Sequence, residues 1–231
     1  MTIRWCRRAG PTGGPSGRRS WRVGNLPVPM ETVAAFDVDK TLTTRDCVVP
    51  FLWRLRGPEL LVGLVPRTPG LVAATATRRR DRVKEVVTAA AVRGLPIATV
   101  DRVGREFEVG FVRRHLRPDA MARLRWHAAN GHRIVLVSAS FRSYLEPLAA
   151  HLGAHAVLST DVEVDESGVC TGRLRGANCR GAEKERRLRE WLGDARPIVY
   201  AYGDSSGDAA MLAFADHSFR VTSAPIPEVP V

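Results

Sequence analysis

The stretch VAAFDVDKT, residues 33–41, constrains the fold of this chain more than any other. A short apolar run of this kind predicts a buried strand of a parallel sheet. Polar residues follow at its carboxyl end, where open α/β sheets bind their ligands. In extended backbone Asp37 and Asp39 would point to the same face, because side chains alternate with period two. A turn that uses aspartate for its local hydrogen bonds explains the same residues, so this stretch alone leaves both interpretations open.

Charge and composition favour a globular protein over a nucleic-acid binder. The 231 residues are 45% hydrophobic, enough for one sizeable core and a smaller unit. The net charge is +11, but six of these charges precede Glu31, which leaves 11 − 6 = +5 on the rest. The basic runs carry no interleaved aromatic pattern, and this argues against specific nucleic-acid recognition. An alternative role for the basic N-terminal residues is an arm that contacts anions.

The cysteines and the apolar stretches indicate a cytoplasmic protein. The four cysteines show no metal-ligand or redox spacing, which is typical of free thiols in a reducing compartment; they are Cys6, Cys47, Cys170 and Cys179. No apolar stretch approaches the ~20 residues of a transmembrane helix. The basic N-terminus lacks the apolar segment of a secretory signal.

The chain divides into four parts by pattern. Residues 1–30 are rich in Gly, Pro, Ser and Arg, which predicts a disordered basic extension that ends at Met30, an alternative start. Residues 45–130 show helical spacing of apolar residues and predict a helical cap whose last helix returns to the sheet. Residues 31–44 and 131–224 form the predicted core domain, and residues 225–231 a loose Pro-rich tail.

Strands alternate with helices in the predicted core. Apolar runs predict strands over residues 133–137, 156–158, 198–202 and 218–221, helices over 144–152, 183–192 and 208–215, and a β-hairpin over 162–174. Such alternation is typical of an α/β fold with a doubly wound, mainly parallel, Rossmann-like sheet. The helical cap is inserted after the first strand.

Polar side chains gather where three of these strands end. Each has an ordinary explanation as a turn residue, a helix cap or a surface cation; they are Asp37, Asp39, Thr41, Ser138, Asp204 and Asp208, with Lys184 opening a later helix. Together they form a set of acids, hydroxyls and one lysine. Carboxylates without His or Cys clusters suit Mg²⁺. A carboxylate nucleophile, a second carboxyl that moves protons, and cationic donors fit phosphoryl transfer.

The motifs DVDKT, VLVSAS, GAEK and GDSSGD, in this order, resemble those of the haloacid dehalogenase superfamily of aspartate-nucleophile phosphatases. The resemblance covers roughly residues 33–221. The long helical insertion and the hairpin resemble the phosphoserine-phosphatase-like branch. This resemblance implies an aspartyl-phosphate mechanism with Mg²⁺ as cofactor.

The resemblance also implies roles for single residues. Asp37 would be the nucleophile and Asp39 the general acid and base. Mg²⁺ would be held by the Asp37 carboxylate, the Asp39 backbone carbonyl and Asp204. The phosphate would be bound by Ser138 and Lys184, with Thr41 stabilising the nucleophile loop beside it and Asp208 supporting the metal site or Lys184.

The implied substrate is a small phosphorylated metabolite, phosphoserine-like. Asp46 stands where phosphoserine phosphatases have a Glu that meets the substrate amine, and Ser138-Ala139-Ser140 replaces their usual Ser-Gly-Gly. An alternative is the phosphate of a phospholipid head group such as phosphatidylglycerophosphate. The apolar residues 60–66 and 71–74, with the arginines 78–80, could contact an anionic membrane, although packing inside the cap explains them too.

An alternative of another class is a non-catalytic, basic nucleic-acid-binding or regulatory protein on the same fold. The joint presence of Asp37, Asp39, Lys184 and Asp204 favours the enzyme. The oligomeric state is left open by the sequence.

Overall fold

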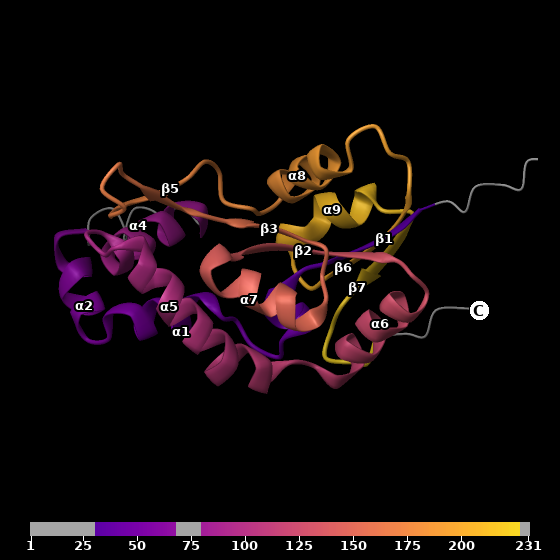
Figure 1. Cartoon of the computed structure of the whole chain (residues 1–231), viewed down its shortest axis with the longest axis horizontal. Helices are drawn as coiled ribbons and strands as arrows, with labels where there is room; N and C mark the ends of the chain where they lie inside the picture. The colour runs from indigo at the N-terminus through magenta and orange to yellow at the C-terminus, as the bar shows by residue number, and fades with distance from the viewer. Residues whose placement is uncertain (1–30, 68–79, 227–231) are drawn as a thin grey trace, which may run out of the picture.

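A computed structural model describes residues 31–67 and 80–226 (Figure 1). The predicted basic extension lies outside the described residues. So do residues 71–74 and the arginines at 78 and 79, which the membrane alternative invoked. Among the described helices, none has the length and apolar character needed to cross a membrane.

Five strands form one sheet in the order β3-β2-β1-β6-β7, and every neighbouring pair is parallel. Their bounds are β1 (Thr32–Phe36), β2 (Arg133–Phe141), β3 (Ala156–Thr160), β6 (Ile198–Gly203) and β7 (His217–Arg220). The chain moves outward from β1 to β3 and then crosses to the other side of β1. The doubly wound α/β fold is therefore confirmed, with its topological switch point between β1 and β6.

Alternate residues of β1 enter two separate cores. Ala34 and Phe36 belong to one apolar cluster, and Val33 and Ala35 to the other. The first cluster is covered by α6 (Pro118–Ala129) and α7 (Arg142–Leu152), the second by α8 (Ala182–Leu192) and α9 (Ala209–Phe214). Figure 1 shows these pairs of helices on opposite faces of the sheet. β1 is therefore buried on both sides, as its continuous apolar run predicts.

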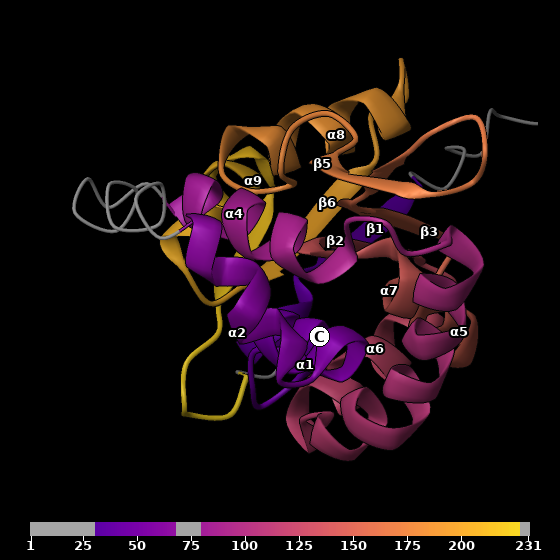
Figure 2. The ribbon, with the colours of Figure 1, turned by 90° about the vertical axis from the view of Figure 1, so that its left-hand side faces the viewer.

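Most of the residues between β1 and β2 form a cap beyond the carboxyl ends of the strands (Figure 2). Its elements are α1 (Val48–Arg56), α2 (Glu59–Leu64), η2 (Val65–Arg67), α4 (Arg80–Val92), α5 (Ile97–Phe107), η3 (Glu108–Val112) and η4 (Arg113–His115). Phe51 of α1 contacts the rings of Phe107, Phe141 and Tyr144. Because these aromatic contacts join α1 to β2 and α7, the cap and one face of the sheet share a continuous core.

The predicted hairpin is present, and it packs on the cap. It consists of β4 (Val162–Val164) and β5 (Cys170–Leu174), which pair antiparallel. The backbone N–H of Gly94 donates to the carbonyl of Cys170 at 2.9 Å, and the N–H of Cys170 donates to the carbonyl of Leu95 at 2.8 Å. The hairpin thus joins the turn between α4 and α5 by backbone hydrogen bonds.

Helix α6, the last helix of the insertion, packs on the sheet, as its sequence pattern predicts, and its His127 contacts Tyr202 of β6 at 2.9 Å. Two details differ from the predicted bounds. Strand β2 continues to Phe141, so Ser138 lies inside the strand and not at its end. At the start of the tail that was predicted to be loose, Ile226 donates its backbone N–H to Asp119 at 3.0 Å. The rest of that tail, residues 227–231, lies outside the described residues.

The cysteine prediction holds for the described residues. Cys47, Cys170 and Cys179 are buried free thiols. Burial raises the pKa of the Cys179 thiol to about 11, so it stays protonated near neutral pH.

Candidate active site

The first strand ends in an irregular turn that presents Asp37 at the switch point. The backbone N–H of Asp37 donates to the carbonyl of Tyr202 at 2.9 Å and so extends the pairing of β1 with β6. The chain then coils through η1 (Val38–Leu42), where Lys40 adopts a left-handed φ of 61°. Such backbone is rare outside glycine and is concentrated at functional sites. The regular strand ends at Phe36, so strand alternation alone does not place Asp37 and Asp39, but both side chains line the same cavity.

Asp37 is held on both carboxylate oxygens. Lys184 Nζ lies 2.6 Å from Asp37 Oδ1, and Thr41 Oγ1 donates to Asp37 Oδ2 at 3.0 Å. Lys184 also lies 2.6 Å from Asp208 Oδ1. All four side chains are almost fully buried. Thr41, predicted to act beside the phosphate, thus contacts Asp37 itself.

The charges in this buried group do not balance. Burial raises the pKa of Asp37 to about 7, although Lys184 opposes the shift. Burial also acts to raise the pKa of Asp208, but Lys184 and Ser205 outweigh it and leave that pKa below its usual value. Burial acts to lower the pKa of Lys184, and the two carboxylates raise it instead. A protonated Lys184 therefore offsets one carboxylate, and a second positive charge would stabilise the ionised form of the other.

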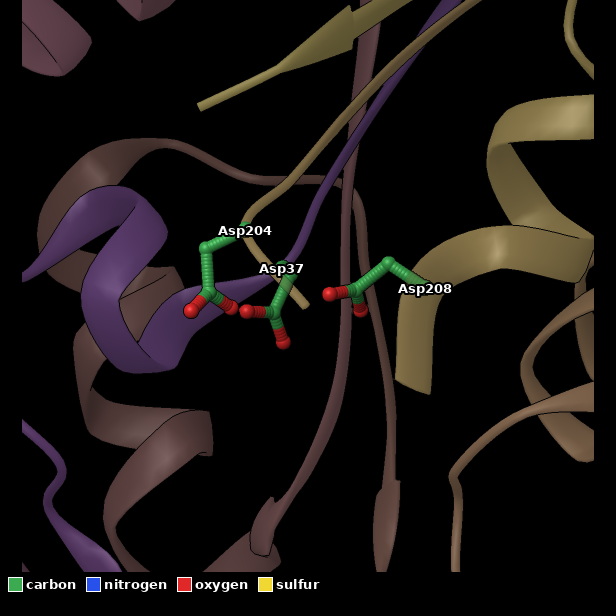
Figure 3. Close-up of side chains that lie close together, drawn as sticks. All are labelled: Asp37, Asp204 and Asp208. Atoms are coloured by element: carbon green, nitrogen blue, oxygen red, sulfur yellow. The ribbon is translucent and has the colours of Figure 1, made fainter. Parts of the chain in front are cut away.

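Asp204 and Asp208 follow β6 and reach Asp37 from the other side of the switch point. One carboxylate oxygen from each of Asp37, Asp204 and Asp208 lies within 4.8 Å of the others. Figure 3 shows the three carboxylates turned toward one another, with Asp37 between the other two. Asp208 Oδ2 accepts hydrogen bonds from the backbone N–H and the hydroxyl of Ser205, both at 2.9 Å. A Cβ at Gly203 would lie 2.5 Å from Asp208 Cβ, so this close approach requires glycine.

This donor set fits a hard divalent cation. The ligands are carboxylate oxygens, and Mg²⁺ prefers oxygen ligands. Burial, and next the charge of Asp208, raise the pKa of Asp204, and the charges of Lys40 and Lys184 oppose this shift. Asp37 and Asp204 would hold the ion, whereas Asp208 is already bound to Lys184 and Ser205.

Asp39 has different partners from Asp37. Ser140 Oγ donates to Asp39 Oδ2 at 2.5 Å, and the backbone N–H of Cys47 donates to Asp39 Oδ1 at 2.8 Å. Burial raises the pKa of this carboxyl above its usual value. The two aspartates therefore occupy distinct environments at one site, which is how a pair of carboxyls can take different roles.

A cavity of about 320 Å³ connects these residues to the cap. Each residue singled out from the sequence lines it except Thr41, which lies behind Asp37. Ser138 is buried and its Oγ accepts the backbone N–H of Ser140 at 3.2 Å. Asp46 is exposed at the rim, and its Oδ1 accepts the backbone N–H of Val48 at 2.9 Å. The predicted site residues are thus brought together at one place.

The sequence interpretation missed Lys84, Asn178 and the role of Ser140. Lys84 of α4 contacts the carbonyl of Ala139 and donates to Asn178 Oδ1 at 2.6 Å. The rarity of lysine in this chain could have drawn attention to Lys84. The chain has only three lysines among its 35 basic residues, and Lys40, Lys84 and Lys184 all line the cavity.

The comparisons with known proteins agree with this geometry. The family model described as haloacid dehalogenase-like hydrolase matches residues 34–213. The chain belongs to this family. The suspected resemblance is therefore confirmed, including its phosphoserine-phosphatase-like character.

Three relatives define the neighbourhood of this hydrolase. Protein CicA from Caulobacter vibrioides is 37% identical over 209 residues, covering 86% of this chain and 94% of CicA. Phosphoserine phosphatase SerB2 from Mycobacterium tuberculosis is 29% identical over 199 residues, covering 85% of this chain and 44% of SerB2. A crystal structure of phosphoserine phosphatase in apo form has a TM-score of 0.59 at 16% identity, over 81% of this chain and 84% of that one. The chain is a phosphatase of this family, related to phosphoserine phosphatases.

Proposed function

We propose that this phosphatase hydrolyses phosphomonoesters with Mg²⁺ through an aspartyl-phosphate on Asp37. The carrying observation is the buried Asp37, fixed by Lys184 and Thr41 at the switch point. A second carboxyl, Asp39, lines the same cavity and is separately held. Bound Mg²⁺, held by Asp37, Asp204 and the backbone carbonyl of Asp39, would offset the negative charge of the transferring phosphate.

In the first step Asp37 attacks phosphorus. The bond from its oxygen to phosphorus forms, the ester P–O bond breaks, and the proton of Asp39 passes to the departing alcohol oxygen. Ser138 and Lys184 donate to the equatorial phosphate oxygens, where negative charge has to be stabilised. The raised pKa of Asp39 suits a group that enters this step protonated.

In the second step water releases the phosphate. The Asp39 carboxylate takes a proton from water as the water oxygen bonds to phosphorus. The Asp37 oxygen–phosphorus bond breaks, inorganic phosphate leaves, and Asp39 is protonated again.

The test is hydrolysis of p-nitrophenyl phosphate with added Mg²⁺, before and after EDTA. We expect turnover that EDTA abolishes and that excess Mg²⁺ restores. Turnover that survives complete chelation would overturn the metal dependence. A folded protein that hydrolyses no phosphate ester would favour the non-catalytic regulatory alternative.

For the substrate we propose a small phosphorylated metabolite, phosphoserine-like. The support is the presence of both signs of charge in the leaving-group part of the cavity, Asp46 at the rim and Lys84 on the cap. Lys84 donates to a carbonyl and an amide oxygen, which leaves the third N–H of its ammonium for a substrate anion. Kinetics on a panel of phosphorylated amino acids, sugars and lipids would test this, and a preference for uncharged alcohols would overturn it.

One observation favours a second candidate, the phosphate of a phospholipid head group. Of six large hydrophobic side chains that are exposed among the described residues, five lie on α1, α2 and η2; they are Val49, Trp53, Leu61, Val62 and Val65. Val49 also lines the cavity, so this apolar surface reaches the active site. Exposed apolar patches of this kind mark contact sites for proteins or membranes.

Vesicle co-sedimentation distinguishes the two candidates. The lipid candidate predicts binding to phosphatidylglycerol vesicles at low salt and weaker binding to phosphatidylcholine vesicles. A Trp53→Ser variant should lose binding, whereas Val109→Ser, an exposed apolar site on η3, should retain it. No binding to anionic vesicles would remove this candidate.

A further inference from the structure

Ser140 lies in an irregular part of β2 that points two hydroxyls toward the site. The register between β2 and β3 shifts between Val137 and Phe141, so the segment between them departs from regular pairing. Such irregularities re-aim side chains next to active sites. Ser138 faces the phosphate site, and Ser140, two residues later, reaches Asp39.

Ser140 forms one of two fixed contacts on the Asp39 carboxyl. Its hydroxyl, on a fully buried residue, lies 2.5 Å from Asp39 Oδ2, and the Cys47 N–H lies 2.8 Å from Oδ1. These donors come from elements that are far apart in the chain, the strand β2 and the residue that precedes α1. Rotation of the Asp39 side chain would break both hydrogen bonds, so the plane of the carboxyl is set from two sides.

Serine is an unexpected choice for this place if only packing matters. The surroundings are largely aromatic: Phe51 contacts both Phe141, the next residue in the strand, and Tyr144, whose phenol interacts with Ser140. A hydroxyl buried in such surroundings costs free energy unless it is hydrogen-bonded. The Asp39 carboxyl supplies that partner, which connects Ser140 to the group proposed to move the proton.

We propose that Ser140 is a positioning residue that orients the Asp39 carboxyl toward the departing alcohol oxygen. The inference rests on the proposed function, because it assigns a supporting role for Asp39 as the acid. Proton transfer counts most when the leaving alcohol is strongly basic and least when the leaving group departs unaided. Loss of the Ser140 hydroxyl therefore damages turnover of alkyl phosphates selectively.

The experiment measures kcat/KM for an alkyl phosphate and for p-nitrophenyl phosphate with saturating Mg²⁺. We expect Ser140→Ala to lower kcat/KM by about 10- to 100-fold on the alkyl ester, the size of effect that a small misplacement produces. On p-nitrophenyl phosphate the fall should be below about threefold, since p-nitrophenolate needs little protonation. Ser140→Thr, which keeps a hydroxyl, should restore the ratio of the two values toward that of the wild type.

Ser159→Ala is the matched control. Ser159 is as buried as Ser140 and lies on the neighbouring strand β3, but its hydroxyl has no hydrogen-bond partner among the described residues. Its loss should leave the ratio unchanged. If Ser140→Ala melts below the assay temperature, Ser140→Cys, which keeps the volume and weakens the donor, replaces it.

The outcomes separate the two proposals. An equal fall on both esters, or no fall, in a folded Ser140 variant overturns the positioning role while leaving the phosphatase proposal intact. Failure of Ser140→Thr to recover the ratio also counts against positioning. A wild-type protein inactive on both esters overturns the proposed function and this inference with it.

Discussion

The two walls of the active-site cavity are built differently. On the sheet side Lys184 lies between Asp37 and Asp208, and the Asp39 carboxyl accepts from two fixed donors. On the cap side Lys84 donates to the carbonyl of Ala139 and the amide oxygen of Asn178 and lies over the ring of Phe141, and the charges of nearby carboxylates, Asp39 first, also act on it. Apolar side chains of α1 and α4 form the remainder of that wall; they are Val48, Val49, Leu52, Val83 and Val87.

This difference separates chemistry from recognition. Groups that react have to be held within a fraction of an ångström, and a network of buried ion pairs at strand ends provides that. Groups that select a substrate need accessible charge and apolar surface that a ligand can cover. The sheet side thus has the properties of a reaction centre, and the cap side those of a binding surface.

The largest expected effect is on the sheet side. Asp37→Asn removes the carboxylate that we propose as the nucleophile while keeping its size, and we expect turnover to fall by roughly 10⁴-fold or more. Circular dichroism should show an unchanged fold, since Lys184 keeps Asp208 as partner. Turnover close to the wild-type value would rule out the covalent mechanism.

Lys184→Met should abolish turnover and also weaken the fold. Two carboxylates would remain buried without their cation, and breaking a buried ion pair typically costs about 3 kcal/mol or more. Urea unfolding measures this loss. Arg186→Met, on the exposed side of the same helix, is the control and should stay close to wild type. Equal stability of the two variants would contradict the network described for the sheet side.

A smaller effect is expected on the cap side. Lys84→Met should raise KM for an anionic substrate about tenfold and change kcat by less than about threefold, because binding is lost and the reacting groups are kept. For p-nitrophenyl phosphate, which has no second anion, the variant should keep the KM of the wild type. If Lys84→Met instead lowered kcat, with unchanged KM, for the anionic substrate and for p-nitrophenyl phosphate alike, Lys84 would belong with the reacting groups. The distinction between the sheet side and the cap side of the cavity would then fail.

The smallest effect concerns pH. Burial lowers the pKa of Lys84 to about 8, whereas the unfolded chain keeps an ordinary value near ~10.4. Between these two pKa values the unfolded state binds more protons than the folded state, so the free energy of unfolding rises with pH. The destabilisation of the folded state by the buried ammonium is complete below about pH 8. In urea unfolding, the free energy of unfolding of the wild type should therefore rise relative to that of Lys84→Met between pH 7 and pH 10. Parallel profiles for the two proteins would contradict the shift.

The sequence predicted the sheet side well for a physical reason. Carboxyl ends of parallel strands meet at one edge, so residues such as Asp37 and Asp204 converge once the strands are recognised. Contacts between segments that are far apart in the chain could not be predicted from the sequence. Nothing local in SAS shows that Ser140 meets Asp39, 101 residues earlier. The helical spacing of α4 likewise shows which residues face inward, but not that Lys84 ends beside Ala139.

The packing of the β4–β5 hairpin has a consequence for how the cap moves. The hairpin lies between β3 and α8 in the chain, so its hydrogen bonds to the α4–α5 turn attach the cap to the core domain in addition to the two ends of the insertion and the aromatic contacts of Phe51. A cap that is attached at several points cannot rotate about its two chain ends alone, because each attachment has to move with it. One further attachment is the hydrogen bond from Lys84 to Asn178, on the segment that leads from the hairpin to helix α8 and its Lys184. A displacement of the cap would therefore strain the segment that positions the cation bound to Asp37.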